Sequence, residues 1–147
     1  AAAGDAKLFV RRRWWQWKRR ERPLERFHSP MIAATGVLVL AIRSDRDLLP
    51  EDRTRIVEVA ARGFRIAADE AEIVMSQTLF ALRGLTDEAI WAERLGRLVA
   101  ERCTLEERAQ VLAMLREIVP EGRLSPRQRQ IAERYGTAAG LERPAPG

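Results

Sequence analysis

The sequence is poor in the residues that usually carry catalysis and covalent cross-links. Its 147 residues include one cysteine, Cys103, and one histidine, His28. A single cysteine excludes a disulfide within the chain and is typical of a reducing compartment. The sequence also contains no Gly-rich phosphate-binding loop and no Cys/His cluster with the spacing of metal ligands. We therefore expect a protein that is not an enzyme.

The lone histidine and the lone cysteine do not form a catalytic pair on sequence grounds. His28 precedes a predicted helix start, where histidine is more often a surface or capping residue than a general base. Cys103 follows Arg102 and precedes another helix start, a setting that can activate a thiol. A nucleophile also needs a base, and residues 31–147 contain no histidine. We interpret Cys103 as a buried structural residue.

Long hydrophobic runs are also lacking. The longest, from Met31 to Ile42, has twelve residues, whereas a membrane-spanning helix needs about 20. No spanning helix is predicted. The expected location is the cytoplasm, with the inner face of the membrane as an alternative.

Positive charge is concentrated at one end of the chain. Residues 1–30 hold nine Lys/Arg and three Asp/Glu, a balance of +6, whereas residues 31–147 hold seventeen and eighteen, a balance of −1. The net charge of +5 therefore comes from the first thirty residues. A basic balance usually indicates nucleic acid or anionic lipid as a partner, and here only this N-terminal arm could make that contact.

After the arm, the pattern of apolar residues and caps predicts an all-α fold, a compact bundle of about six helices without a strand. The first helix is expected at about residues 30–43, with Ser29 as its N-cap and Pro30 in its first position. Its apolar residues on every side place it at the centre of the core. The third is expected to start near Asp69 as a capping box with Glu72. Its buried stripe is predicted as Ile73, Gln77, Phe80 and Ala81. The other helices are expected after Pro50 and Thr86, and at two further capping boxes, Thr104 with Glu107 and Ser125 with Gln128.

Three parts of the chain follow from these patterns. Residues 1–29 form the Trp/Arg-rich arm, residues 30–140 form the helical domain, and residues 141–147 form a tail without an apolar stripe that we expect to be disordered.

Two stretches of the helical domain echo each other at an offset of 76 residues. Residues 42–50, IRSDRDLLP, align with residues 118–126, IVPEGRLSP. In each, a helix is expected to end, an acidic residue enters a turn, and a proline starts the next helix. We call residues 43–52 the first corner and residues 119–128 the second corner. Their similarity indicates an internal duplication.

The corners resemble those of the tellurite-resistance TerB-like family, in which the pattern Ala-Asp-Gly-x-Leu/Val-Ser-x-x-Glu occurs twice in one helical domain. This chain has SDRDLLPED at residues 44–52 and PEGRLSPRQ at residues 120–128. Between them, CTLEER at residues 103–108 is similar to a phrase common in related sequences. The resemblance covers residues 31–140 and leaves out the arm.

The resemblance implies an acidic, cation-attracting surface at the corners. Its candidate metal ligands are Asp45, Asp52 and Glu121, whose oxygens suit a hard divalent cation. The chain departs from the family pattern in both corners, because Arg46 replaces a glycine and Gln128 replaces an acid. Asp52 also has a structural interpretation, since an acid in the first turn of a helix stabilises the helix dipole.

The arm leaves several partners open. A protein partner is favoured, because Trp and Arg are enriched at interface hot spots. The alternatives are an anionic membrane surface, nucleic acid bound through phosphates and stacked bases, or the chain's own domain. The candidate partner-binding residues are Arg11, Arg12, Arg13, Trp14, Trp15, Trp17, Lys18, Arg19, Arg20 and Arg22.

These observations predict a non-enzymatic accessory or adaptor subunit that docks through its arm onto a larger, membrane-associated or soluble assembly. The alternatives are a peripheral membrane or ion-responsive stress protein related to tellurite resistance, and a nucleic-acid-binding module. No cofactor is expected beyond a divalent cation at the corners.

Overall fold

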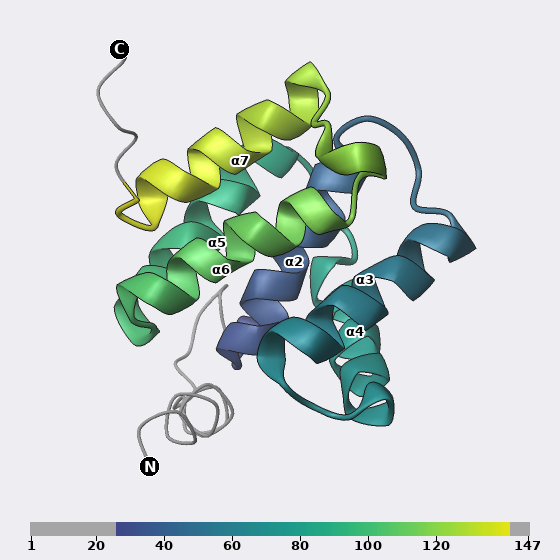
Figure 1. The fold of residues 1–147 in the computed structure, drawn as a ribbon. Helices are drawn as coiled ribbons and strands as arrows, with labels where there is room; N and C mark the ends of the chain where they lie inside the picture. Colours follow the sequence, from purple (N-terminus) through teal and green to yellow (C-terminus); the bar gives the residue numbers. More distant parts are fainter. Residues whose placement is uncertain (1–25, 142–147) are drawn as a thin grey trace.

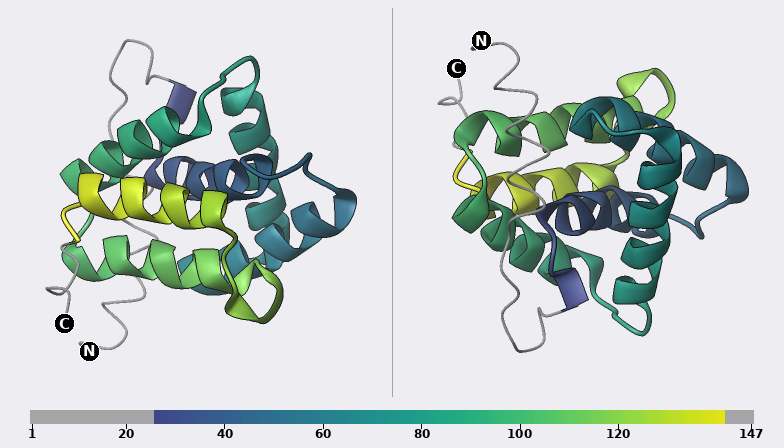
Figure 2. Two further views of the ribbon diagram at one scale, coloured as in Figure 1. Left: turned by 90° about the horizontal axis from the view of Figure 1, so that it is seen from above. Right: turned by 90° about the horizontal axis from the view of Figure 1, so that it is seen from below.

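The computed structural model describes residues 26–141, and the regular secondary structure of this part of the chain is all helical, with no strand. Its elements pack around one another as a single bundle (Figures 1 and 2). The elements are α2 (Pro30–Arg43), α3 (Pro50–Phe64), α4 (Ala68–Leu82), α5 (Glu88–Arg102), α6 (Leu105–Glu117), the 3-10 helix η2 (Pro120–Gly122) and α7 (Pro126–Ala138). The expected all-α bundle of six α-helices is confirmed over these residues.

Helix α2 forms the centre of the bundle. It contacts all five of the other α-helices, and every residue from Pro30 to Ile42 is buried. The Ser29 hydroxyl accepts a hydrogen bond from the Met31 N–H at 3.1 Å, and Pro30 occupies the first position of the helix. The predicted bounds, cap and central position of this helix are confirmed.

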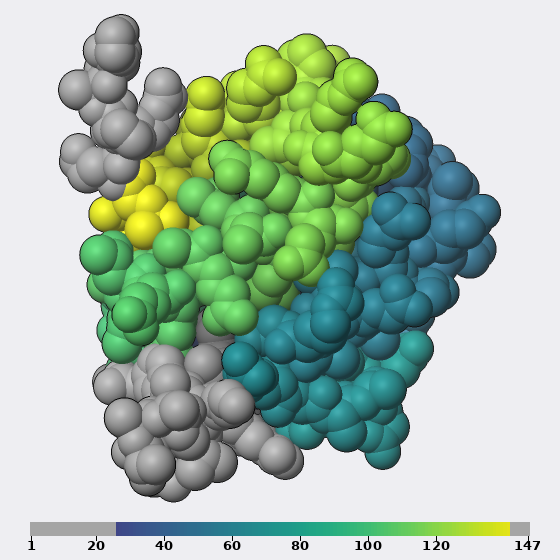
Figure 3. Space-filling view, viewed as in Figure 1, coloured from purple at the N-terminus to yellow at the C-terminus, as the bar shows by residue number. Residues whose placement is uncertain are grey.

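Helices α5 and α7 pack closely against each other. A Cβ atom added at Gly96 of α5 would lie 2.9 Å from both the Ala138 Cβ and the Tyr135 carbonyl oxygen of α7. Only glycine allows the two backbones to approach this closely. In the space-filling view, α6, the second corner and the end of α7 share one face, with α3 beside them (Figure 3).

The predicted buried face of α4 is wrong. Ile73 is 58% exposed and Phe80 is 63% exposed, and Gln77 is exposed beside them, while only Ala81 of the predicted stripe is buried. Helices α2 and α3 pack instead against another face of α4. That face consists of Ala71, Val74, Met75, Thr78, Ala81 and Leu82.

The predicted capping boxes are confirmed at two helices and wrong at a third. Thr104 with Glu107 caps α6, and Ser125 with Gln128 caps α7, each as a reciprocal pair of hydrogen bonds. Helix α4 begins at Ala68 after Ala67, and the Asp69 carboxylate accepts from the neighbouring Glu70 N–H. Asp69 therefore lies inside the first turn of α4 and does not cap it.

The described fold extends beyond the domain limits expected from sequence. Phe27, assigned above to the arm, is fully buried. Leu141, assigned to the tail, packs against the core and donates its N–H to the Gly136 carbonyl at 2.8 Å. The rest of the predicted arm and tail, residues 1–25 and 142–147, lies outside the described residues.

Candidate functional site

The chain enters the described domain at a firmly held point. The Phe27 ring lies 6.0 Å, centroid to centroid, from the half-buried Trp91 ring of α5. The Arg26 guanidinium donates to two carbonyls at the C-terminal end of α4, Ala81 at 3.3 Å and Arg83 at 3.2 Å. Carbonyls at this end of a helix have no partner within the helix. Arg26 therefore attaches the base of the arm to α4. All ten candidate partner-binding residues lie outside the described residues.

A surface hollow of about 430 Å³ lies beside this attachment point. Its lining comes from the base of the arm and from α4, namely Arg26, His28, Ser76, Gln77, Phe80 and Ala81. The Arg83 guanidinium lies over the Phe80 ring at 4.2 Å from its centroid, an arrangement that favours a cation at an aromatic face. We call the exposed Ile73, Gln77 and Phe80, together with this hollow, the α4 face.

Sequence reasoning missed the α4 face because it assigned those side chains to the core. A signal was present in the same helix. Residues 71, 74, 75, 78 and 82 recur at spacings of three and four and are apolar apart from one threonine, so they also match the pattern of a buried helical stripe. Two candidate stripes on one helix indicate that one of them is a surface.

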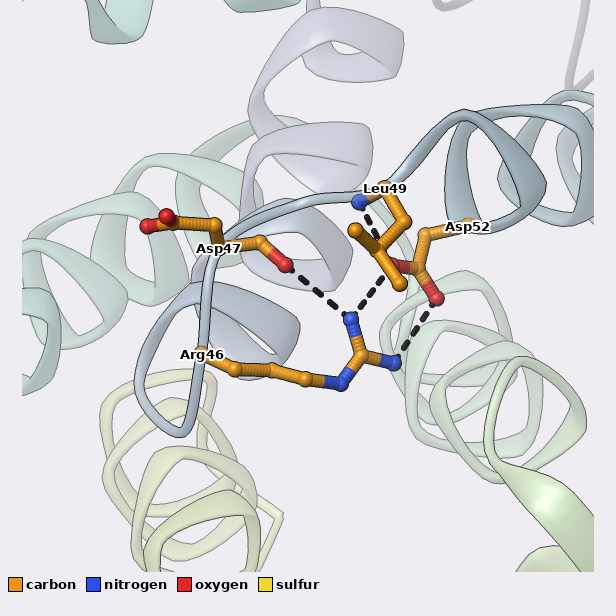
Figure 4. A network of polar contacts seen from close by, with 4 residues as sticks. All are labelled: Arg46, Asp47, Leu49 and Asp52. Carbon is orange, nitrogen blue, oxygen red and sulfur yellow. Dashed lines mark hydrogen bonds and ion pairs between the residues drawn. The ribbon is translucent and has the colours of Figure 1, made fainter.

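The first corner is held by an ion pair that sequence reasoning did not anticipate (Figure 4). The Arg46 guanidinium donates to both carboxylate oxygens of Asp52, at 2.6 and 3.0 Å, and to the Asp47 carbonyl at 3.0 Å. Asp52 also accepts from the Leu49 N–H at 2.8 Å. The Arg46 hydrogen bonds, helped by the one from Leu49, hold the pKa of Asp52 below its ordinary value. Asp52 is thus an ionised capping residue with a built-in counter-charge.

The second corner uses a different backbone. Glu121 and Gly122 both adopt left-handed conformations, with φ of 56° and 69°. The Gln128 amide oxygen accepts from the Ser125 N–H at 2.9 Å, in the role that Asp52 has at Leu49. The corners are neighbours, because Arg127 donates to the Ser44 carbonyl at 3.2 Å.

The structure does not bring the three candidate metal ligands together. Asp52 is paired with Arg46, Asp45 is an exposed turn residue, and Glu121 lies 3.6 Å from the Arg123 guanidinium in the other corner. Within residues 26–141, no three His, Cys, Asp or Glu side chains form a group that could hold a metal ion. A cation at Asp52 would have to displace the Arg46 guanidinium, which already supplies the positive charge there.

Cys103 lies inside the bundle and ends α5. It is 7% exposed, and its carbonyl accepts from Arg108, whose guanidinium also donates to the Ala139 carbonyl. The Tyr135 hydroxyl donates to the Arg108 carbonyl at 2.8 Å, and burial raises the pKa of this phenol. These groups tie the ends of α5 and α7 to α6. The arrangement suits a structural role, since a reactive thiol needs access to its substrate.

Comparisons with known proteins return no family model, no curated protein and no solved structure that matches this chain. The resemblance to the TerB-like family therefore stays a prediction from the corner motifs. Among the helices over residues 26–141, none is both long and apolar enough to cross a membrane.

Proposed function

We propose that this protein is a non-catalytic adaptor that binds a larger protein assembly through two adjacent elements, its Trp/Arg-rich arm and the α4 face. The observation that supports this proposal most directly is the exposure of Ile73 and Phe80 next to the point where Arg26 fastens the arm. Large apolar side chains grouped on one exposed face often mark an interaction surface.

The charge and the residue types of the arm suit the same kind of protein partner as the α4 face does. Residues 1–25 hold eight basic and three acidic side chains together with three tryptophans. Trp and Arg are among the residue types enriched at interface hot spots. A protein partner with an acidic rim and an apolar pocket would satisfy both elements at once. The ion-responsive alternative has less support, because Arg46 already neutralises Asp52.

The test uses the full chain and three variants. Phe80→Glu disrupts the α4 face, a triple change of Trp14, Trp15 and Trp17 to Ala disrupts the arm, and Leu105→Glu is the matched control. Leu105 is 56% exposed at the start of α6, where an acid suits the helix dipole. Each variant is used in quantitative cross-linking pulldown from native extract, liposome flotation and nucleic-acid shift assays.

The expected result is a discrete set of protein partners that is lost in both the Phe80 and the Trp variants and retained in the Leu105 variant. Loss in the Trp variant alone would show that the arm docks without the α4 face. Binding to anionic liposomes or to nucleic acid, with no specific protein captured, would replace the proposal by the corresponding alternative. Identical behaviour of all four proteins in the three assays would refute it.

A further inference from the structure

A second hollow lies between α6 and α7, away from the α4 face. It has a volume of about 390 Å³, within the range of small-molecule sites, which are mostly apolar with a few polar groups. Its apolar lining comes from α6, the second corner, α7 and the residue that ends the described fold, namely Leu112, Leu115, Leu124, Ala132 and Leu141. We call this hollow the α6–α7 groove.

The groove is polar at one end. Arg116, in the last turn of α6, and Arg129, in the first turn of α7, both line it next to the second corner. Arg129 also donates to the Leu124 carbonyl, at 3.4 Å. The one acid in the lining is Glu133, a turn further along α7. Two guanidinium groups at the corner end favour an anion there, and guanidinium pairs especially well with carboxylates.

The other end of the groove is mostly apolar, with Thr137 as a polar residue in its lining, and it has room. Gly136 lies in its floor, and a Cβ added there would meet only the Leu112 Cδ1 at 3.8 Å and the Leu141 carbonyl oxygen at 4.0 Å. Gly136 is the seventh residue after Arg129 in α7, a distance of about 10 Å at the helical rise. The site is thus a slot with a cationic entrance and a mostly apolar far end.

We propose that the α6–α7 groove binds the alkyl chain of a free fatty acid, with its carboxylate at Arg116 and Arg129 and its chain directed towards Gly136. Charge complementarity selects this occupant over a neutral or cationic amphiphile, because the two arginines lie at one end while the remaining lining is chiefly apolar. The proposal is independent of the adaptor function, which rests on the α4 face and the arm.

The experiment measures binding of sodium decanoate to the full chain by calorimetry, below its micelle-forming concentration, and maps it by amide chemical shifts. Decanol and decyltrimethylammonium are the probes with the same chain and a neutral or cationic head. Decanoate is expected to bind at least about tenfold more tightly than either, with shifts at Ala132, Gly136 and Leu141.

Three variants complete the test. Gly136→Leu fills the floor and should abolish decanoate binding, whereas Phe80→Glu, at the other hollow, should leave it unchanged. Replacing both Arg116 and Arg129 by Gln should bring decanoate down to the affinity of decanol, which keeps the test valid if Gly136→Leu perturbs the fold. The proposal would be overturned by equal affinity for the three head groups, by the absence of saturable decanoate binding, or by a change of oligomeric mass in Gly136→Leu. A change of oligomeric mass would assign the groove to a second copy of the chain.

Discussion

The two corners make the same hydrogen bond with different chemistry. In each, the third residue of the new helix reaches back to the N–H of the residue before the helix, Asp52 to Leu49 and Gln128 to Ser125. The first corner has a charged acceptor and a leucine that offers no side-chain acceptor in return. The second corner has a neutral acceptor and a serine hydroxyl that completes the pair.

The turns before those caps differ more. Glu121 and Gly122 have positive φ, whereas none of the residues of the first corner does. Arg46, which aligns with Gly122, uses its side chain to hold the turn through Asp52 and the Asp47 carbonyl. The two corners therefore share the same hydrogen bond at the helix start. The turn of the second corner depends on left-handed backbone conformations, whereas the turn of the first is held by a side-chain ion pair.

The largest expected effect on stability comes from replacing Gly122 of the second corner by arginine, the residue found at the aligned position 46 of the first corner. Gly122→Arg places a side chain at φ 69°, which costs an L-residue about 1–2 kcal/mol. Urea unfolding should show a lower midpoint with an unchanged slope. The control, Glu121→Gly at the adjacent left-handed position, should not destabilise the protein by a similar amount. An unchanged midpoint for Gly122→Arg would show that this turn does not depend on glycine.

A smaller effect on stability, with a distinct pH dependence, is expected at Asp52 and Gln128, the two residues that accept the hydrogen bond at the helix start. Asp52→Asn should cost about 0.5–1 kcal/mol at neutral pH, because half-exposed Arg46 limits the strength of the pair. The folded pKa of Asp52 lies below its unfolded value. Its contribution is therefore present above the unfolded pKa and is lost as pH falls through the folded pKa.

The matched variant for this prediction is Gln128→Ala. Its free energy of unfolding should be lower by about 1 kcal/mol, because one hydrogen bond is missing. This loss should be the same at every pH, because an amide does not titrate. Denaturant midpoints measured from pH 7 down to pH 3 give both profiles. A pH-independent loss for Asp52→Asn would contradict the assigned role of its charge.

A modest gain is expected from copying the second corner's cap into the first. Leu49 is 46% exposed and already has the extended conformation of an N-cap residue. Leu49→Ser supplies the missing acceptor and should be about 0.5–1 kcal/mol more stable than Leu49→Ala, which removes the same leucine without adding a hydroxyl. Thermal and urea unfolding compare the two variants directly. Equal stability would mean that the first corner cannot form the reciprocal pair.

Added divalent cations are expected to have no effect on stability. Calcium or magnesium at millimolar concentration should leave the thermal midpoint of the full chain unchanged, because Arg46 binds both oxygens of Asp52. Ligands that bind the folded state raise that midpoint. An increase of more than about 1 °C that disappears in Asp52→Asn would restore the cation site implied by the family resemblance.

Much of the fold could be predicted because its signals are local. Ser29-Pro30, Thr104 with Glu107, and Ser125 with Gln128 mark helix starts through bonds within one turn. Helix α2 was placed at the core because its apolar residues leave it no polar side. The candidate site was less predictable. Sequence reasoning located the corners but not the Arg46–Asp52 pair, since Arg46 precedes the helix and meets Asp52 only when the turn has folded.

The sequence by itself determined the capped starts of α2, α6 and α7, the central position of α2 and the separation of a basic arm from a nearly neutral body. Each of these depends on composition or on contacts a few residues apart. Tertiary structure alone decided which stripe of α4 is buried. Both stripes satisfy helical periodicity, and the choice was made by α2 and α3, which pack against Val74, Met75 and Thr78 and leave Ile73 and Phe80 exposed beside the base of the arm.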